Sequence, residues 1–345
     1  MIDNYSFLHS INSKVCDTKP SADFLSNPHN ILILSVNHEV TEKIFQSLHH
    51  YQIVLNDSDL AFPGILQDRD QQFPLYSEVL SKGKCKVFIL QNKLSELKYL
   101  FEAIDIAGKS FNVQLFHNSL SYCNATFSDF NPRCLENMVN IGISATQSHL
   151  SGENMLSDQH FDSYRLGQLL NNMEVVNDAI SYADVVVADI SALKQCDIPG
   201  RNDIASSGLS SEAFNHIARN AGLSRAQITV LTGLENLNSE DCIGIDTLAQ
   251  FIYYYLDGAK IQGRQNSEGN LISYTIDECL PYESVKFLKN DFSGSWFAEF
   301  PTRLPDHLAH LQLVPCSYQD YQLSGRGELS PRILDVFKTL DNIVN

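Results

Sequence analysis

An apolar run from Val185 to Ala188 restricts the fold of this chain more than any other feature of its sequence. Three consecutive valines without polar alternation favour a strand that is buried on both faces, as strands of parallel sheets are. Asp189 and Ser191 follow the run and are therefore expected just beyond the end of this strand. Because open α/β sheets bind ligands at the carboxyl ends of their strands, the run predicts a parallel α/β sheet with a polar site at this edge.

The length and composition of the chain suit one large α/β domain. Its 345 residues are 43% hydrophobic, which is enough for a sizeable core. Over residues 30–260, the order of strand and helix patterns predicts a three-layer α/β/α sandwich with a mainly parallel sheet. Residues 270–325 carry alternating strand patterns around turn signals near residues 290–295. We therefore expect a single domain over residues 1–345, with a small β-rich C-terminal extension over about residues 266–325.

Local signals predict individual elements and their ends. Strands are expected over residues 30–36, 85–90, 113–116 and 228–232. Ser210 or Ser211 is expected to cap the helix that follows it. Amphipathic patterns predict one helix over residues 158–181 and another over residues 246–257, with Gly258 ending the second.

The charge balance excludes some classes of partner. The formal net charge is −17 and the isoelectric point is near 4.9, whereas phosphate binding requires clustered Lys and Arg. We therefore expect neither nucleic acid nor a membrane as a partner. No run approaches the roughly 18 apolar residues of a membrane span, and no export signal opens the sequence. A cytoplasmic protein is expected, with its eight scattered cysteines as reduced thiols.

Residues 184–200 resemble the third metal-binding motif of the ureohydrolase family, which includes arginase, agmatinase and formimidoylglutamase. In that motif a buried strand ends in Asp-x-Asp-x-x-Asp-Pro, and the three acidic positions here are Asp189, Ser191 and Lys194. Residues 206–210 resemble the family's Gly-Leu-Ser/Thr helix start, and Glu235 stands where the family has a substrate-facing Glu. The sequence is most similar to a divergent formimidoylglutamase-like branch, which also has a C-terminal extension.

The resemblance implies that the metal-ligand positions of the family are Lys93, His117, Ser119, Ser121, Asp189 and Ser191. A dimanganese site needs about six ligands, mostly carboxylate oxygens, to hold two cations around one hydroxide. Only Asp189 supplies a carboxylate and only His117 an imidazole, and a protonated Lys93 has no lone pair for a metal. The resemblance thus implies a ureohydrolase fold with degenerate metal motifs. The loop after the first strand, which helps to wall the family's substrate pocket, is shortened or missing.

Several of these side chains allow more than one interpretation. Asp189 can cap the turn after its strand, or it can form a buried ion pair with Lys93 in which the ammonium replaces a lost cation. His117 and His149 could bind one zinc ion or act as catalytic bases, but no third zinc ligand has a recognisable spacing. Satisfied polar groups near the pocket are therefore the favoured interpretation of both histidines. Glu235 and His149 are the candidates for catalytic residues.

Two functions are compatible with this pattern, and the first is favoured. It is a catalytically inactive protein that binds no cofactor and serves as a binding or scaffold subunit, through an unknown protein partner or self-association. The alternative is an active hydrolase with two manganese ions that cleaves a linear amidine or guanidino compound. A metal-independent activity of Lys93 or His117 has no support beyond the presence of these side chains.

Overall fold

The computed structural model describes residues 21–48, 50–51, 60–62, 65–66, 69–108, 111–119, 135–143, 163–173, 176–177, 180, 183–265, 271–291 and 294–344. They form two compact units, one within residues 1–260 and the other within residues 261–345. A single domain over the whole chain stays a prediction. None of the helices in these ranges is long and apolar enough to cross a membrane. The cysteines in these ranges are free thiols: Cys85, Cys196, Cys242, Cys279 and Cys316.

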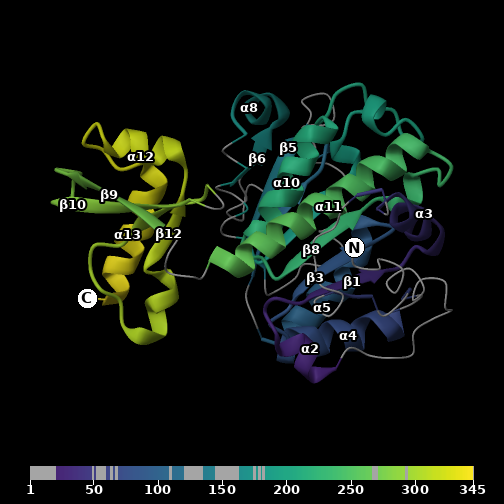
Figure 1. The fold of residues 1–345 in the computed structure, drawn as a ribbon, viewed down its shortest axis with the longest axis horizontal. Coiled ribbons are helices and arrows are strands. Elements are labelled where there is room, and N and C mark those ends of the chain that lie inside the picture. The colour runs from purple at the N-terminus through teal and green to yellow at the C-terminus, as the bar shows by residue number, and fades with distance from the viewer. Residues whose placement is uncertain are drawn as a thin grey trace. The chain divides into compact units, whose positions relative to one another are not determined.

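A parallel sheet forms the centre of the first unit (Figure 1). Its eight described strands follow the order β2-β1-β3-β8-β7-β4-β5-β6, and each pair of neighbours is parallel. The strands are β1 Ile31–Ser35, β2 Leu60–Ala61, β3 Lys86–Leu90, β4 Phe111–Phe116, β5 Leu135–Ile143, β6 Ser163–Arg165, β7 Val185–Asp189 and β8 Ile228–Thr232. Every residue of β1, β3, β7 and β8 is buried. The prediction of a parallel sheet around the valine run is confirmed.

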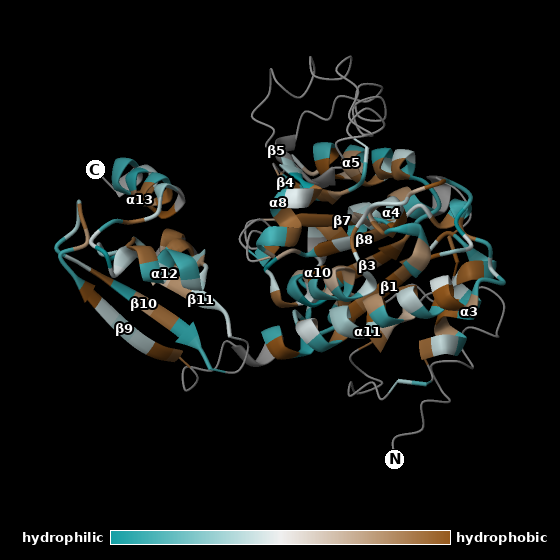
Figure 2. Cartoon of the chain, turned by 90° about the horizontal axis from the view of Figure 1, so that it is seen from above, coloured by the Kyte–Doolittle hydropathy of each residue, from teal (hydrophilic) through white to brown (hydrophobic). Residues whose placement is uncertain are grey.

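Helices cover both faces of this sheet (Figures 1 and 2). Buried side chains of α3, α10 and α11 pack on one face, and those of α2, α4 and α5 pack on the other. The helices are α2 Ala22–Ser26, α3 His38–Leu48, α4 Arg69–Lys82, α5 Leu97–Ile106, α8 Leu166–Asn171, α10 Ser211–Leu223 and α11 Cys242–Gln265. Short 3-10 turns are η2 Leu94–Glu96, η4 Ile190–Ala192, η5 Gln195–Asp197 and η6 Leu234–Asn236. The three-layer α/β/α arrangement is therefore confirmed.

The contact between α10 and α11 explains one wrong prediction about a helix end. Gly258 does not end α11, which continues to Gln265. A Cβ atom at Gly258 would lie 2.2 Å from the carbonyl oxygen of Arg219, and one at Gly222 would lie 2.2 Å from that of Tyr255. The two glycines therefore allow the helix backbones to approach closely, and Gly258 serves packing within a helix rather than its termination.

The helix predicted over residues 158–181 is also wrong in part. Ser163–Arg165 form the edge strand β6, and the helix that follows, α8, ends at Asn171. Asn172 has extended backbone, with φ −149° and ψ 94°, and asparagine disfavours helix interiors because its side chain competes for backbone hydrogen bonds. Leu169, Val176 and Ile180 still join the core. Their apolar spacing thus indicated burial and not one continuous helix.

Lys86, at the start of β3, is a buried amine inside the first unit. Lys86 is only 4% exposed. Its Nζ donates hydrogen bonds to the carbonyl oxygens of Ser224 at 2.8 Å and Ala226 at 3.0 Å. Burial lowers the pKa of Lys86 to about 7. A neutral amine has two N–H groups, which match these two acceptors.

The buried amine makes the stability of the protein depend on pH. We expect the free energy of unfolding, relative to that of a Lys86→Met variant, to rise by about 2 kcal/mol between pH 7 and pH 9. In this range the unfolded chain holds the proton, because an exposed lysine has a pKa of about 10.4, whereas the folded protein releases it above about 7. The unfolded state binds more protons, so stability rises with pH. Urea titrations at each pH measure the difference, and parallel pH profiles of the two proteins would contradict it.

The second unit contains an antiparallel sheet and two helices. Within the described residues its four strands follow the order β12-β11-β10-β9. They are β9 Leu271–Asp277, β10 Ser284–Asn290, β11 Trp296–Glu299 and β12 Leu313–Cys316, with a 3-10 turn η8 Asp306–Leu311 and helices α12 Tyr318–Ser324 and α13 Pro331–Val344. The β-rich extension is confirmed. The two helices were not predicted, although Ile333, Phe337 and Leu340 of α13 are buried at helical spacing.

Candidate functional site

The carboxyl ends of β4 and β7 bring His117 and Asp189 together. Asp189 is the last residue of β7, and His117 follows the last residue of its neighbour β4. Nε2 of His117 lies 4.0 Å from Oδ1 of Asp189, and both side chains are buried. The same Oδ1 accepts a hydrogen bond from the backbone N–H of Ser191 at 2.8 Å. Asp189 therefore caps the turn after its strand, as one of the two interpretations predicted.

The hydrogen bonds of His117 determine which nitrogen carries its proton. The backbone N–H of Ser119 donates to Nδ1 of His117 at 2.9 Å. The lone pair of a neutral ring is therefore on Nδ1, and the proton is on Nε2, facing Asp189. Burial lowers the pKa of His117, against the opposing effect of the negative charge on Asp189. At 4.0 Å the N–H of Nε2 faces the carboxylate without a direct hydrogen bond, and a neutral ring in this orientation directs no lone pair toward it.

Gly233, in the turn after β8, closes the space beside this carboxylate. Its φ is +91°, a left-handed conformation that glycine adopts without strain. A Cβ atom there would lie 3.1 Å from Oδ1 of Asp189 and 2.9 Å from the side chain of Ile190. The backbone of the β8 turn therefore lies directly against Asp189.

Arg201 organises the loop that follows β7. Nη1 of its buried side chain donates to the carbonyl oxygens of Ile190 at 2.6 Å and Leu193 at 2.9 Å. Nε lies 2.5 Å from Oδ1 of Asp203. Neither Arg201 nor Asp203 was predicted from the sequence. The signal that could have found Arg201 is an arginine directly after Pro199 and Gly200, at the end of the segment 184–200 that resembles the family's metal motif.

The loops after β3 and β8 carry an exposed ion pair. Nζ of Lys93 lies 2.8 Å from Oε2 of Glu235, and the two side chains are 52% and 36% exposed. The predicted pair of Lys93 with Asp189 is therefore wrong. Asp189 is the last residue of its strand and is buried, whereas Lys93 lies beyond the end of β3 in a turn that reaches solvent. There it meets the carboxylate of Glu235, which lies on the turn of the adjacent strand β8.

The exposure of this pair limits its contribution to stability. We expect Lys93→Met to lower the free energy of unfolding by less than about 1 kcal/mol, because solvent screens exposed ion pairs. A double-mutant cycle with Glu235→Gln in urea denaturation isolates the coupling between the two side chains. A loss of about 3 kcal/mol or more would instead indicate a buried pair and would contradict the observed geometry.

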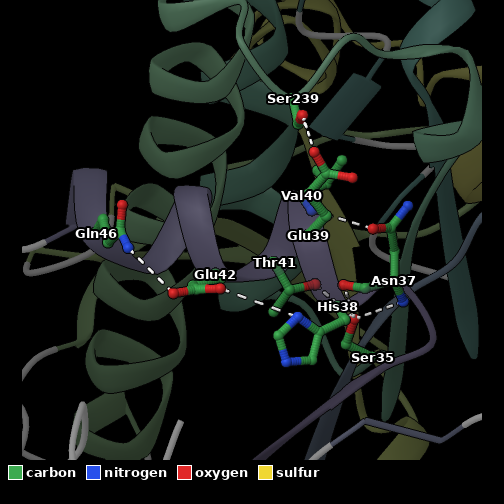
Figure 3. Close-up of polar contacts among 9 residues, drawn as sticks. All are labelled: Ser35, Asn37, His38, Glu39, Val40, Thr41, Glu42, Gln46 and Ser239. Atoms are coloured by element: carbon green, nitrogen blue, oxygen red, sulfur yellow. Dashed lines mark hydrogen bonds and ion pairs between the residues drawn. The ribbon is translucent and has the colours of Figure 1, made fainter. Parts of the chain in front are cut away.

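The connection from β1 to α3 is short and closed by polar contacts (Figure 3). β1 ends at Ser35 and α3 begins at His38. Asn37 lies between them, where its Oδ1 accepts from the backbone N–H of Val40 at 3.0 Å and its Nδ2 donates to Oδ1 of Asn92 at 2.7 Å. The prediction of a short loop after the first strand is confirmed, and Asn37 joins this loop to the loop after β3.

Of the remaining predicted site residues, the structure describes Ser191 and Ser119 but not Ser121 and His149. Ser191 lies in η4 beside Asp189, and its Oγ is buried without a hydrogen-bond partner among the described residues. Ser119 follows β4 and orients His117 through its backbone. Ser121 and His149 lie outside the described residues. The structure thus brings together Asp189, Ser191, His117 and Ser119, and it places Lys93 with Glu235.

The strand order and the helix layers define an α/β fold of the arginase type. Formiminoglutamase from Trypanosoma cruzi, solved with manganese, has a TM-score of 0.61 at 14% identity, covering 73% of this chain and 97% of that one. Formimidoylglutamase from Bacillus subtilis has a TM-score of 0.55 at 13% identity, covering 67% and 87%. Arginase from Bacillus cereus has 0.50 at 12% identity, covering 66% and 98%. No protein-family model and no curated protein matches the sequence. The predicted likeness to ureohydrolases is confirmed for the fold.

The described residues do not fit the two manganese ions that this fold implies. Within the described ranges, no three His, Cys, Asp or Glu side chains form a group that could hold a metal ion. Asp189 supplies one carboxylate, Nδ1 of His117 accepts from Ser119, and the ammonium of Lys93 has no lone pair. Manganese and similar hard cations require several oxygen ligands. The donors that the described residues supply at this edge of the sheet are therefore too few for a dimanganese centre.

Proposed function

We propose that this chain is a divergent, formimidoylglutamase-like ureohydrolase that has lost its dimanganese chemistry and acts as a binding or scaffold subunit in the cytoplasm. One observation carries the proposal: the side chains at the family's ligand positions are engaged with protein groups that would compete with a metal. Lys93 is paired with Glu235, and the carboxylate of Asp189 is engaged by the backbone of Ser191 and faces His117.

The charge balance at this edge of the sheet supports the proposal. A site for two divalent cations needs an excess of negative charge from its ligands. Here Glu235 lies against Lys93, and Asp203 lies against the guanidinium of Arg201. Among the described residues, Asp189 and Glu96 remain; Oδ1 of Asp189 already accepts from the backbone N–H of Ser191, and Oε2 of Glu96 from that of Asn92. The two described cations thus offset part of the negative charge, which weakens the attraction for manganese.

Metal content tests the proposal directly. The full chain is purified without chelators, dialysed against manganese and then against buffer, and its manganese is measured by mass spectrometry. We expect far less than one equivalent per chain, and no hydrolysis of formiminoglutamate, agmatine or arginine. The Trypanosoma cruzi formiminoglutamase, which was solved with manganese, is the positive control for loading and for the assay of its own substrate.

An Asp189→Asn variant separates specific from adventitious metal. It removes the one carboxylate at the family's ligand positions, so a specific site would lose its manganese and an adventitious one would not. Two equivalents in the wild type, with hydrolysis that Asp189→Asn abolishes, would overturn the proposal. That result would establish the alternative of a manganese-dependent hydrolase of a linear amidine or guanidino compound, with further ligands outside the described residues.

A further inference from the structure

The antiparallel sheet of the second unit ends in a regular edge strand, β9. Its seven residues, Leu271–Asp277, pair one by one with β10 from Asn290 back to Ser284, without a register shift. On its other side, β9 has no neighbouring strand in the part of the chain that the structure describes. Figures 1 and 2 show β9 and β10 as a long ribbon with β9 at the border of the sheet.

The hairpin contacts determine which backbone groups of β9 point away from the sheet. In an antiparallel pair, alternate residues direct both N–H and C=O toward the same neighbour. The N–H of Glu278 donates to the carbonyl of Glu283 at 2.7 Å across the β9–β10 hairpin. Counting back from Glu278 in steps of two assigns residues 276, 274 and 272 to the side of β10. Residues 271, 273, 275 and 277 therefore direct their backbone groups outward, in a row ready for another strand.

The side chains of β9 lack the usual protection of an exposed edge. Proteins commonly block such edges with proline, lysine, a bulge or a very short strand. β9 has seven paired residues, contains no proline and no cation, and carries a single charge, on Asp277. Its apolar side chains are incompletely covered: Ile272 is 42% exposed, and Tyr274 and Ile276 are half-buried. These properties are typical of a strand that pairs with a further strand.

The sequence of β9 is complementary to itself when read in the opposite direction. In an antiparallel pair of two copies with Tyr274 opposite its own counterpart, each Ile272 lies opposite an Ile276 and each Ser273 opposite a Thr275. Leu271 then lies opposite Asp277, so no like charges face each other. In this register the outward backbone groups of residues 273 and 275 meet as a hydrogen-bonded pair, and Tyr274 forms the closer, non-hydrogen-bonded pair at the centre.

We propose that two copies of this chain associate through β9, with a twofold axis at Tyr274, so that their antiparallel sheets join into one continuous sheet. We assign a second copy of β9 as the neighbour of this edge because the antiparallel pair centred on Tyr274 uses all seven residues and pairs each Ile272 with an Ile276. The same register also satisfies the outward backbone groups of residues 271, 273, 275 and 277. Twofold association of identical surfaces is the common route to homodimers. This proposal does not depend on the metal chemistry of the first unit.

A charge-swap experiment on the full chain tests both the interface and its register. Ser273 and Thr275 are exposed and lie opposite each other in the proposed pair. A Ser273→Lys/Thr275→Lys variant puts like charges opposite each other twice, and a Ser273→Glu/Thr275→Glu variant does the same with negative charges. Sedimentation velocity should show a concentration-dependent dimer of the wild type, and we expect each variant to raise the dissociation constant about tenfold or more. An equimolar mixture of the two variants should recover the wild-type dimer.

The controls make each outcome decisive. A Thr302→Lys/Thr339→Lys variant adds the same charge at exposed positions after β11 and on α13, neither of them in β9, and should dimerise like the wild type. Thermal denaturation of each variant verifies that the second unit is folded. A wild type that stays monomeric at all concentrations would overturn the proposal, as expected if another segment of the chain covers β9. A dimer that tolerates both charged variants would also overturn it, because a different surface would then mediate association.

Discussion

Arg201→Met is expected to lower the free energy of unfolding of the protein by about 3–4 kcal/mol. The guanidinium is buried and donates to the carbonyl oxygens of Ile190 and Leu193. Methionine fills a similar volume but donates no hydrogen bond, so the loop after β7 loses two charge-assisted bonds and Asp203 loses its partner. Urea denaturation followed by far-ultraviolet circular dichroism measures the loss.

Two further variants show whether geometry or charge causes this loss. Arg201→Lys keeps the positive charge but not the fork of donors, so it should remain at least about 1 kcal/mol less stable than the wild type. Arg219→Met is the matched control, since Arg219 is one-third exposed and paired with a half-exposed Asp257, and its loss should stay below about 1 kcal/mol. An Arg201→Met variant as stable as Arg219→Met would show that the buried contacts contribute little.

Gly258→Val is expected to lower the free energy of unfolding by about 3 kcal/mol. A Cβ atom at this position would lie 2.2 Å from the carbonyl oxygen of Arg219 and 3.0 Å from the backbone nitrogen of Leu223. Both groups belong to the backbone of α10, so no side chain can turn away to make room. The helices must separate, which opens the core beneath them. Thermal and urea denaturation of the full chain measure the effect.

Gly167→Ala is the control for the general effect of removing a helical glycine. Gly167 lies in α8, and nothing lies within 4 Å of a Cβ atom placed there. Alanine favours the helix by up to about 1 kcal/mol relative to glycine, so this variant should be as stable as the wild type or slightly more so. If Gly258→Val behaved like Gly167→Ala, the close approach of α10 and α11 would be contradicted.

Strands and helix starts with strong local signals could be predicted from the sequence. The strand over residues 228–232 was predicted with the bounds that the structure gives it, and the valine run became β7. Ser210 caps α10 by accepting from the backbone N–H of Ala213 at 3.3 Å. These elements form because of residues close together in the sequence: runs of β-branched apolar residues form the strands, and a serine hydroxyl caps the helix.

Elements whose limits depend on distant residues could not be predicted in this way. Gly258 looked like a helix end, but it lies within α11 because α10 packs against it. Residues 163–165 looked helical, but they add to the edge of the sheet beside β5. In both cases the decisive contact comes from a segment far along the chain, which local pattern does not contain.

The sequence by itself determined the layered α/β fold, the position of Asp189 at the end of its central strand, and the substitutions at the family's metal-ligand positions. These properties follow from apolar patterning and residue type. Only the tertiary structure decided which polar groups meet: Lys93 with Glu235, His117 with Asp189, and Arg201 with the carbonyls of the loop after β7. The physical reason is that such pairs depend on distances and burial at the ends of different strands, and a difference of a few residues in loop length moves a charge from the buried edge to solvent.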